Sequence, residues 1–398
     1  MYIERPMISA RQFILLAFIG GMVIKGLMLP SILMRISGKD GLFVMAFYFL
    51  IEIINLTLFS LLIVKFPEKT FFNILSECFG KVISRVIALA IMVAALIKFT
   101  LNLSEVKAFF SIEMFASFNW TVMVIPLIAL CFTIAVKSLR VLGRTAEIFF
   151  PFILAGIIFL SLILFREVPF ENVLPLLDGG IKPVLDGIKE FPIWFGDVIV
   201  MAVALGNVKK GKHMTLKCVL MRMFAAVMIL AFSVVLFATY GNIAPLVKYG
   251  HNITSLTQYN LGSQQYGRFD LIIYAVWMSG VFIKMAMNCY LGVRCTAFLF
   301  NVRNYKYVAA ALAVVSFVLS VWLVPTVGKV YVLSTSLWAK IIFSFVEYCL
   351  PAVTFIAANV KYGNKNSGEE SGSELGDKSG GEPQPCGVCQ GEKSGEPG

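Results

Sequence analysis

Charged residues are scarce in this chain of 398 residues, because Asp, Glu, Lys and Arg together make up only 14% of it. A water-soluble domain carries about 25% charged residues. Hydrophobic residues reach 59%, and the mean hydropathy is +0.84. The shortage of charge argues against a water-soluble protein and predicts a chain whose surface faces a lipid bilayer.

Histidine is also scarce. The two histidines, His213 and His251, lie in predicted loops, so metal or triad chemistry based on histidine is not expected. The sequence contains no P-loop and no G-x-G-x-x-G motif. Cys386 and Cys389 form a lone C-x-x-C pair, which without a second pair is weak support for zinc or redox chemistry. We therefore expect no enzyme, no cofactor and no metal site.

The net charge of +11 does not indicate a nucleic-acid partner. No basic helix with interleaved aromatic residues lies outside the apolar segments. Lys and Arg gather instead in short loops, such as the one with Lys209, Lys210 and Lys212, as the positive-inside rule describes. This pattern places the N-terminus in the cytoplasm, and an even number of spans returns the C-terminus to the same side.

Long apolar segments dominate the rest of the chain. About 20 apolar residues are enough for a helix to cross the hydrocarbon core of a bilayer. Ten such segments are predicted, at about residues 10–34, 41–64, 83–112, 120–136, 144–165, 189–208, 214–240, 269–300, 307–324 and 333–359. The predicted fold is an all-α membrane protein with about ten transmembrane helices.

The ten segments divide into two sets of five. Five spans form an odd-numbered repeat, so the second set must insert upside down relative to the first. We predict one repeat over residues 1–165 and its inverted copy over 191–360. Between them, residues 166–190 predict an outside loop with an interfacial half-helix. The tail, 361–398, is rich in Gly, Ser, Glu and Pro, and is predicted to be disordered and cytoplasmic.

The first helix of each repeat is predicted to be broken. Segment 10–34 opens with a Ser-x-x-Gln capping box and then contains Gly20-Gly21, and segment 189–208 contains Gly196-Asp197. Backbone groups freed by unwinding in lipid are tolerated only where they line a cavity or bind something. Paired interruptions of this kind point to a transporter-like binding site. The alternative is that these glycines serve only close helix packing.

Several charges lie at membrane depth, where each needs a partner or a function. The first such residues lie in segment 83–112. Asn102 and Glu105 follow Lys98 by four and seven residues, so the three side chains lie on one face of the helix. Lys340 and Glu347 repeat this spacing. One interpretation predicts that Lys98 is neutralised by Glu105, and Lys340 by Glu347. The other is that these charges have a function in the membrane.

Lys284, with Asn288 one turn further on, and Asp197 have no opposite charge one turn away. They must therefore pair across helices or face water. We hypothesise that Lys284 supplies a fixed positive charge in a cavity lined by the first, third, sixth and eighth segments.

The order and spacing of several short motifs resemble a known family. These are ISARQF (8–13), LGRTAEIFFPF (142–152), LPLLDGGIKPVLDG (174–187) and FPIWFGD (191–197). The chain is similar to the B subunit of spore nutrient-germinant receptors, the spore germination permeases of the amino acid–polyamine–organocation superfamily.

The resemblance implies a five-plus-five inverted repeat in the inner membrane of a bacterial spore. It also implies A and C receptor subunits as partners, and a small nutrient such as an amino acid as ligand. With the buried charges added, the candidate ligand-binding residues are Gly20, Gly21, Lys98, Glu105, Gly196, Asp197, Lys284 and Asn288. An ordinary amino-acid or amine transporter and a ligand-free structural or channel subunit remain as alternatives.

Overall fold

The structure is a computed structural model, and the regular elements in its described residues are all helical. Within the described residues the only β-type pairing is an isolated bridge between Ile8 and Val208. The predicted all-α class is therefore confirmed for this part of the chain. The residues that the structure describes are 8–22, 25, 29–67, 69–110, 119–165, 168–177, 179–190, 192–241, 270–324, 332 and 335–375.

Eight helices in the described residues are long and apolar enough to cross a membrane, so the chain is a multi-pass membrane protein. Their agreement with the predicted segments is close, and for 214–240 the bounds coincide. They are α3 (Gly41–Lys65), α4 (Phe71–Phe109), α5 (Trp120–Lys137), α6 (Leu139–Leu164), α9 (Met214–Tyr240), α11 (Asp270–Phe300), α12 (Tyr305–Leu323), and α14 (Leu337–Ser344) continued through a π-helical turn (Phe345–Cys349) into α15 (Leu350–Leu375).

The two largest differences from the predicted bounds lie at the start of α4 and at the end of α15. Helix α4 begins at Phe71 rather than near residue 83, because Gly80, at φ 79°, joins a short first helix to the apolar span. Helix α15 continues to Leu375, past the predicted start of the tail at residue 361. The rest of the tail lies outside the described residues. The predicted division into two repeats, a loop and a tail stays a prediction.

The two remaining predicted spans are built from shorter pieces. Segment 10–34 becomes α1 (Ala10–Met22) and α2 (Leu29–Ser37), with Lys25 in a turn between them. The capping box is present, since Gln12 N–H donates to Ser9 Oγ at 3.2 Å and Ser9 N–H to Gln12 Oε1 at 3.1 Å. The capping box therefore fixes the start of α1.

Segment 189–208, predicted to be broken at Gly196-Asp197, is interrupted there and contains little regular helix. It holds a 3₁₀ turn, η4 (Pro192–Trp194), the one-turn helix α8 (Ile199–Ala202), and turns that lead to the bridge at Val208. Gly196, at φ 81°, lies between η4 and α8, and only glycine adopts such a backbone angle without strain. The described part of the chain thus has eight helices that are long and apolar enough to span a membrane, and the total of ten stays a prediction.

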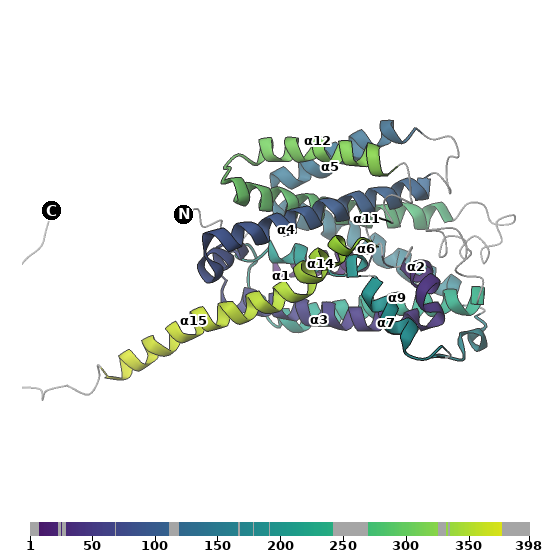
Figure 1. Cartoon of the computed structure of the whole chain (residues 1–398), viewed down its shortest axis with the longest axis horizontal. Helices are drawn as coiled ribbons and strands as arrows, with labels where there is room; N and C mark the ends of the chain where they lie inside the picture. The colour runs from purple at the N-terminus through teal and green to yellow at the C-terminus, as the bar shows by residue number, and fades with distance from the viewer. Residues whose placement is uncertain are drawn as a thin grey trace, which may run out of the picture. The chain divides into compact units, whose positions relative to one another are not determined.

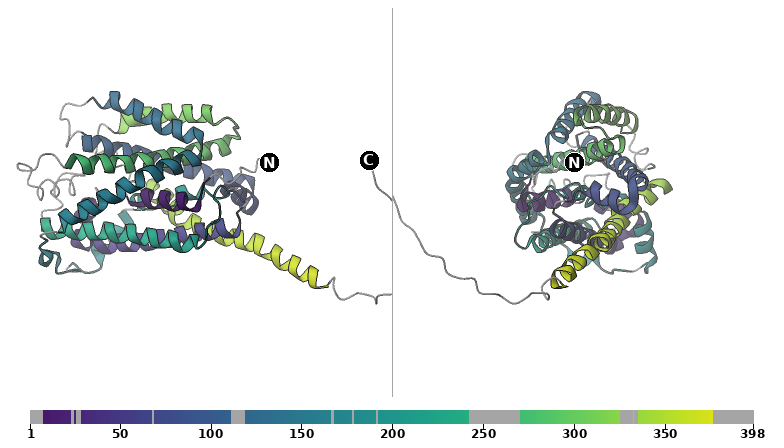
Figure 2. Two further views of the ribbon diagram at one scale, coloured as in Figure 1. Left: turned by 180° about the vertical axis from the view of Figure 1, so that it is seen from behind. Right: turned by 90° about the vertical axis from the view of Figure 1, so that its left-hand side faces the viewer.

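Helix α11 forms the centre of the unit Met1–Phe355. It packs against α4, α5, α6 and α12. Of its most apolar stretch 78% is buried, against 22% for α6. Helix α1 packs against α6, α9 and α11, and α3 packs against α9. The long helices of this unit run alongside one another in Figures 1 and 2. The short pieces of the two interrupted segments therefore lie among unbroken helices.

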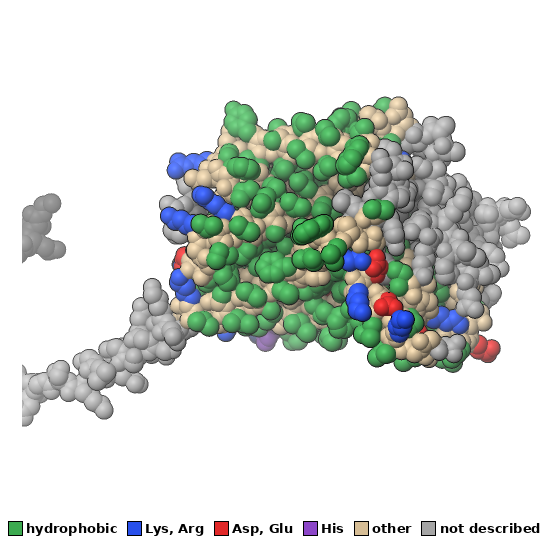
Figure 3. All heavy atoms as spheres, viewed as in Figure 1, with side chains coloured by type: hydrophobic (Ala, Val, Ile, Leu, Met, Phe, Trp, Pro, Cys, Tyr) green, Lys and Arg blue, Asp and Glu red, His purple; other side chains and the backbone are tan. Residues whose placement is uncertain are grey.

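The outward face of this unit is apolar through its middle. Figure 3 shows hydrophobic side chains covering the central band, with basic side chains at the left end and charged side chains of both signs at the lower right. Large hydrophobic side chains of this unit are exposed, and among them Leu162 is 72% and Val86 61% exposed. An apolar band between charged ends is the surface that a bilayer requires.

Candidate functional site

Seven charged side chains meet where the interrupted segments cross the unbroken helices. We call this set the charge cluster. All seven are between 0% and 7% exposed. The cations are Lys25, Lys98, Arg222 and Lys284, and the anions are Glu52, Asp197 and Glu347. A buried charge is strongly unfavourable unless it is paired and hydrogen-bonded, so these contacts must carry the local structure.

Asp197 is the centre of the charge cluster. Its Oδ2 lies 3.1 Å from Lys25 Nζ and 3.1 Å from Lys284 Nζ, and its Oδ1 lies 3.2 Å from Lys98 Nζ. These ammonium groups come from the turn after α1, from α11 and from α4. One carboxylate therefore joins three parts of the chain that are far apart in sequence.

Freed backbone groups of the second break are bound by the same charges. Lys98 Nζ donates to the Phe195 carbonyl at 2.7 Å, and the Gly196 N–H donates to Glu52 Oε1 at 2.7 Å. Glu52 also pairs with Lys25 and with Arg222. The charge cluster thus supplies the hydrogen bonds that a continuous helix would have made within itself.

The glycines at the breaks make room for these charges. A Cβ on Gly21 would overlap the Arg222 guanidinium, and one on Gly196 would overlap the Glu347 side chain. A Cβ on Gly20 would lie 3.0 Å from Met287 Cε, a side-chain end that can move. At Gly21 and Gly196, close approach to a charged group explains the glycine.

Glu347 is the member of the charge cluster that the last spanning helix contributes. It lies in the π-helical turn Phe345–Cys349, and its carboxylate is 2.5 Å from Lys98 Nζ. Asn55 Nδ2 donates to the Glu347 carbonyl at 2.9 Å, which ties the turn to α3. π-helical turns occur often at functional sites.

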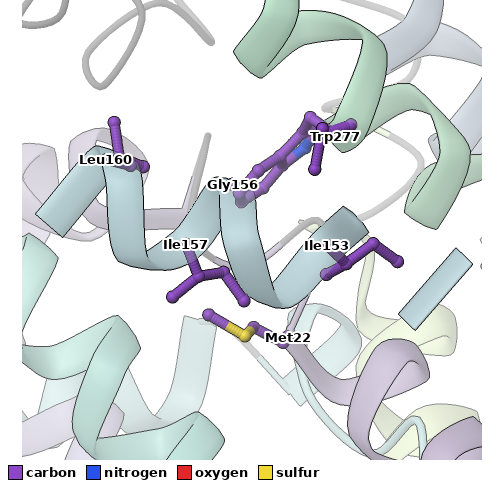
Figure 4. A pocket seen from close by; sticks show the side chains of 7 residues that line it. Met22, Ile153, Gly156, Ile157, Leu160 and Trp277 are labelled. Carbon is purple, nitrogen blue, oxygen red and sulfur yellow. The ribbon is translucent and has the colours of Figure 1, made fainter. Parts of the chain in front are cut away.

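Little space remains at the breaks. The cavity lined by Gly20, Gly21, Asp197, Arg222 and Met287 measures about 10 Å³, room for about one water molecule. A neighbouring apolar cavity of about 20 Å³ lies beside Gly156 of α6, between Met22 and Trp277 (Figure 4). In this conformation the ion pairs themselves occupy the predicted midplane chamber.

A family model described as spore germination protein matches residues 7–326. That range includes both interrupted segments and every member of the charge cluster except Glu347. The chain belongs to the spore germination protein family. No curated protein matches it.

In this spore germination protein, two predicted ion pairs are wrong. Lys98 pairs with Asp197 and Glu347 rather than with Glu105, and Lys340 pairs with Glu190 at 2.5 Å rather than with Glu347. Residues seven apart on a helix share a face but are separated by about 10 Å along the axis. Acidic residues on neighbouring segments therefore lie closer to Lys98 and Lys340 than the acidic residue on the same helix does.

The prediction that Lys284 pairs across helices is confirmed by its contact with Asp197. Glu105 and Asn288 are buried, at 8% and 2% exposure. Within the described residues, neither carboxylate oxygen of Glu105 has a hydrogen-bond partner, nor has Asn288 Nδ2. The roles of the eight candidate residues in ligand binding stay predictions.

Four members of the charge cluster were not among the predicted site residues of this spore germination protein: Lys25, Glu52, Arg222 and Glu347. Each could have been recognised from the sequence. Lys25 follows the glycine pair of the first break, and Glu52, Arg222 and Glu347 are charges inside apolar runs. An intramembrane charge is by default a candidate for a functional site.

Proposed function

We propose that this chain is the membrane-embedded nutrient-sensing subunit of a spore germinant receptor. It binds a small amino-acid-like germinant at the midplane, between the interrupted segments, and triggers germination together with A and C partner subunits. In this proposal the chain has the five-plus-five inverted repeat and lies in the spore inner membrane, with both termini in the cytoplasm.

One observation carries the proposal: buried polar atoms without partners lie on the same helices as the charge cluster. Glu105 lies two turns from Lys98 on α4, and Asn288 lies one turn from Lys284 on α11. The Glu105 oxygens and Asn288 Nδ2 have no hydrogen-bond partner within the described residues. Buried polar groups are rarely left in this state. An amino acid offers an ammonium group for the carboxyl of Glu105 and a carboxylate for the amide of Asn288.

The charge cluster also supports a mechanism for sensing. Its four cations and three anions are paired with one another. A zwitterion competes for these partners, because its carboxylate attracts the lysines that Asp197 holds and its ammonium attracts the carboxylates. Breaking those contacts frees the two interrupted segments to move. The resulting shift cannot exceed the difference in ligand affinity between the two conformations.

The first test is genetic. Deletion of the gene is expected to abolish germination in response to one nutrient class while germination with other nutrients is retained, scored with single nutrients. Restoring the gene should recover the response, and restoring a Glu105→Gln variant should recover it only at raised nutrient concentration. Unchanged germination of the deletion strain with every nutrient would contradict the proposal.

A second test separates sensing from transport, since the interrupted segments fit both. An amino acid or amine transporter of the same superfamily moves its substrate without other subunits. The purified chain in proteoliposomes is therefore assayed for uptake of radiolabelled amino acids, with protein-free liposomes as the control. Uptake by the chain alone would favour the transporter, and a nutrient-dependent thermal shift without uptake would favour the sensor.

A further inference from the structure

Glu105 differs from the acidic residues of the charge cluster. It is buried on the spanning helix α4, at 8% exposure, and within the described residues neither of its carboxyl oxygens has a hydrogen-bond partner. Asp197, by contrast, has three ammonium groups at 3.1 to 3.2 Å. An ionised carboxylate buried without a partner is so unfavourable that the group takes up a proton and becomes neutral. The surroundings of Glu105 therefore favour the neutral acid.

The charges that act on Glu105 are already engaged with each other. They are those of Lys284 on α11 and Asp197 at the second break, which pair at 3.1 Å. The π-helical turn that also packs against α4 contributes Glu347, which pairs with Lys98. Neither lysine therefore needs Glu105 as its counter-ion.

Other basic side chains lie on the elements that pack against α4. They are Arg294 of α11, Lys306 of α12 and Lys340 of α14. Lys340 pairs with Glu190, and Lys306 is exposed. Arg294 lies beside the start of α4, whereas Glu105 lies near its end. On α4 itself, Lys107 donates to a backbone carbonyl at 3.4 Å.

The charge cluster carries one positive charge in excess, because it holds four cations and three anions. An amino acid is a zwitterion, so it brings one negative and one positive group. Its carboxylate supplies the anion that the charge cluster lacks, and its ammonium group then needs an anion of its own. Glu105, on the same helix as Lys98, can supply that anion once it has lost its proton.

We propose that Glu105 carries a proton and releases it when the ammonium group of an amino acid binds. The O–H bond of Glu105 breaks, its electron pair stays on the carboxylate, and the proton passes to water. The buried site then changes from one excess positive charge to none, which is favourable in a medium that solvates charge poorly. This inference rests on the proposed function and adds to it that a germinant is exchanged for a proton.

Calorimetry on the full-length chain in phosphatidylcholine nanodiscs counts the released proton. The probes are the common amino acids, tested singly between about pH 5.5 and about pH 6.5, where the ammonium and carboxylate groups of the probe keep their charges. For each probe that binds, the heat is compared between buffers of different ionisation enthalpy. We expect about one proton per bound amino acid, and an affinity that rises about 10-fold per pH unit, since a lower proton concentration favours release. The N-acetyl derivative of such a probe lacks the ammonium group and should release no proton.

Glu105→Gln is the decisive variant, because glutamine has nearly the shape of the neutral acid but no proton to release. We expect the proton count to fall from about one to about zero, and the dependence of affinity on pH to disappear. Glu105→Asp keeps a carboxyl group and should keep the release. The matched control is Glu190→Gln, which makes the same chemical change at the partly exposed pair with Lys340 and should leave the proton count unchanged.

A second measurement needs no bound amino acid. The infrared difference spectrum of the wild type minus Glu105→Gln should contain the carbonyl stretch of a protonated carboxyl group. Addition of a probe that binds should remove this band from the wild type. A carboxylate band in its place before any probe is added would overturn the inference, because Glu105 would already be ionised.

The outcomes separate this inference from the proposed function. An amino acid that binds without releasing a proton, or that releases it equally from Glu105→Gln, would overturn the inference and leave the proposed function standing. If no amino acid binds, the proposed function fails and the inference fails with it.

Discussion

The surroundings of the cations differ between the charge cluster and a second, larger cavity. This large cavity lies between the start of α4, Asn207 and the end of α11. In the charge cluster four cations are held by three acidic side chains, and the cavity that remains is about 10 Å³. In the large cavity two arginines line about 300 Å³ with no acidic residue in the described wall. A cation paired within the protein fixes structure until a ligand competes for its partner. The cations of the large cavity line open space instead.

The largest effect is expected from Asp197→Asn. The substitution leaves three ammonium groups facing a neutral amide, and loss of one partner of a buried ion pair destabilises a protein by about 3–5 kcal/mol. Thermal unfolding of the purified chain in nanodiscs measures the loss. The matched control is Asp186→Asn, since Asp186 forms an exposed pair with Lys189 at 4.0 Å. If both variants lost the same stability, the cluster would not hold the fold.

The next effect tests the glycine of the first break. Gly21→Ala should cost about 1–3 kcal/mol, the range for overpacking in a filled interior, because its Cβ displaces Arg222 from Glu52. Gly292→Ala is the control, since a Cβ there meets only Leu312 at 3.9 Å and Ala95 at 4.0 Å. The measurement is again the shift in unfolding temperature. A loss at Gly292 as large as that at Gly21 would contradict the contact with Arg222.

Glu105→Gln should affect response more than stability. Glu105 has no hydrogen-bond partner within the described residues, so we expect its replacement to change the unfolding free energy by less than about 1 kcal/mol. The nutrient concentration for half-maximal germination should rise about 10-fold, as for a lost hydrogen bond to a charged group. Glu190→Gln, at the partly exposed pair with Lys340, is the control. An unchanged nutrient response would remove Glu105 from the proposed site.

The smallest effect is expected from Lys340→Gln. Lys340 and Glu190 pair at 2.5 Å, but both side chains are about a quarter exposed, at 23% and 26%. Pairs in contact with water contribute about 0–1 kcal/mol. A loss of unfolding temperature comparable with that of Asp197→Asn would mean that burial does not separate the two kinds of ion pair.

The sequence by itself determined the helices and the position of the two breaks. An apolar run such as Gly41–Lys65 or Met214–Tyr240 must form a helix in lipid, because every backbone group needs a partner within the segment. Gly196 marked the second break because its positive φ favours glycine. Gly21, in the last turn of α1 just before the first break, is explained by its close approach to the Arg222 guanidinium. These are local properties, and local chemistry is enough to predict them.

Only the tertiary structure decided which charges meet and where space remains. Lys98 pairs with Asp197, which is 99 residues away in the sequence, and Arg222 pairs with Glu52, which is 170 residues away. The partner predicted for Lys98 on its own helix, Glu105, has no hydrogen-bond partner within the described residues. The large cavity likewise joins the start of α4 to the end of α11. Pairing energy falls with distance in space rather than in sequence, and a cavity is set by the side chains that fail to fill it.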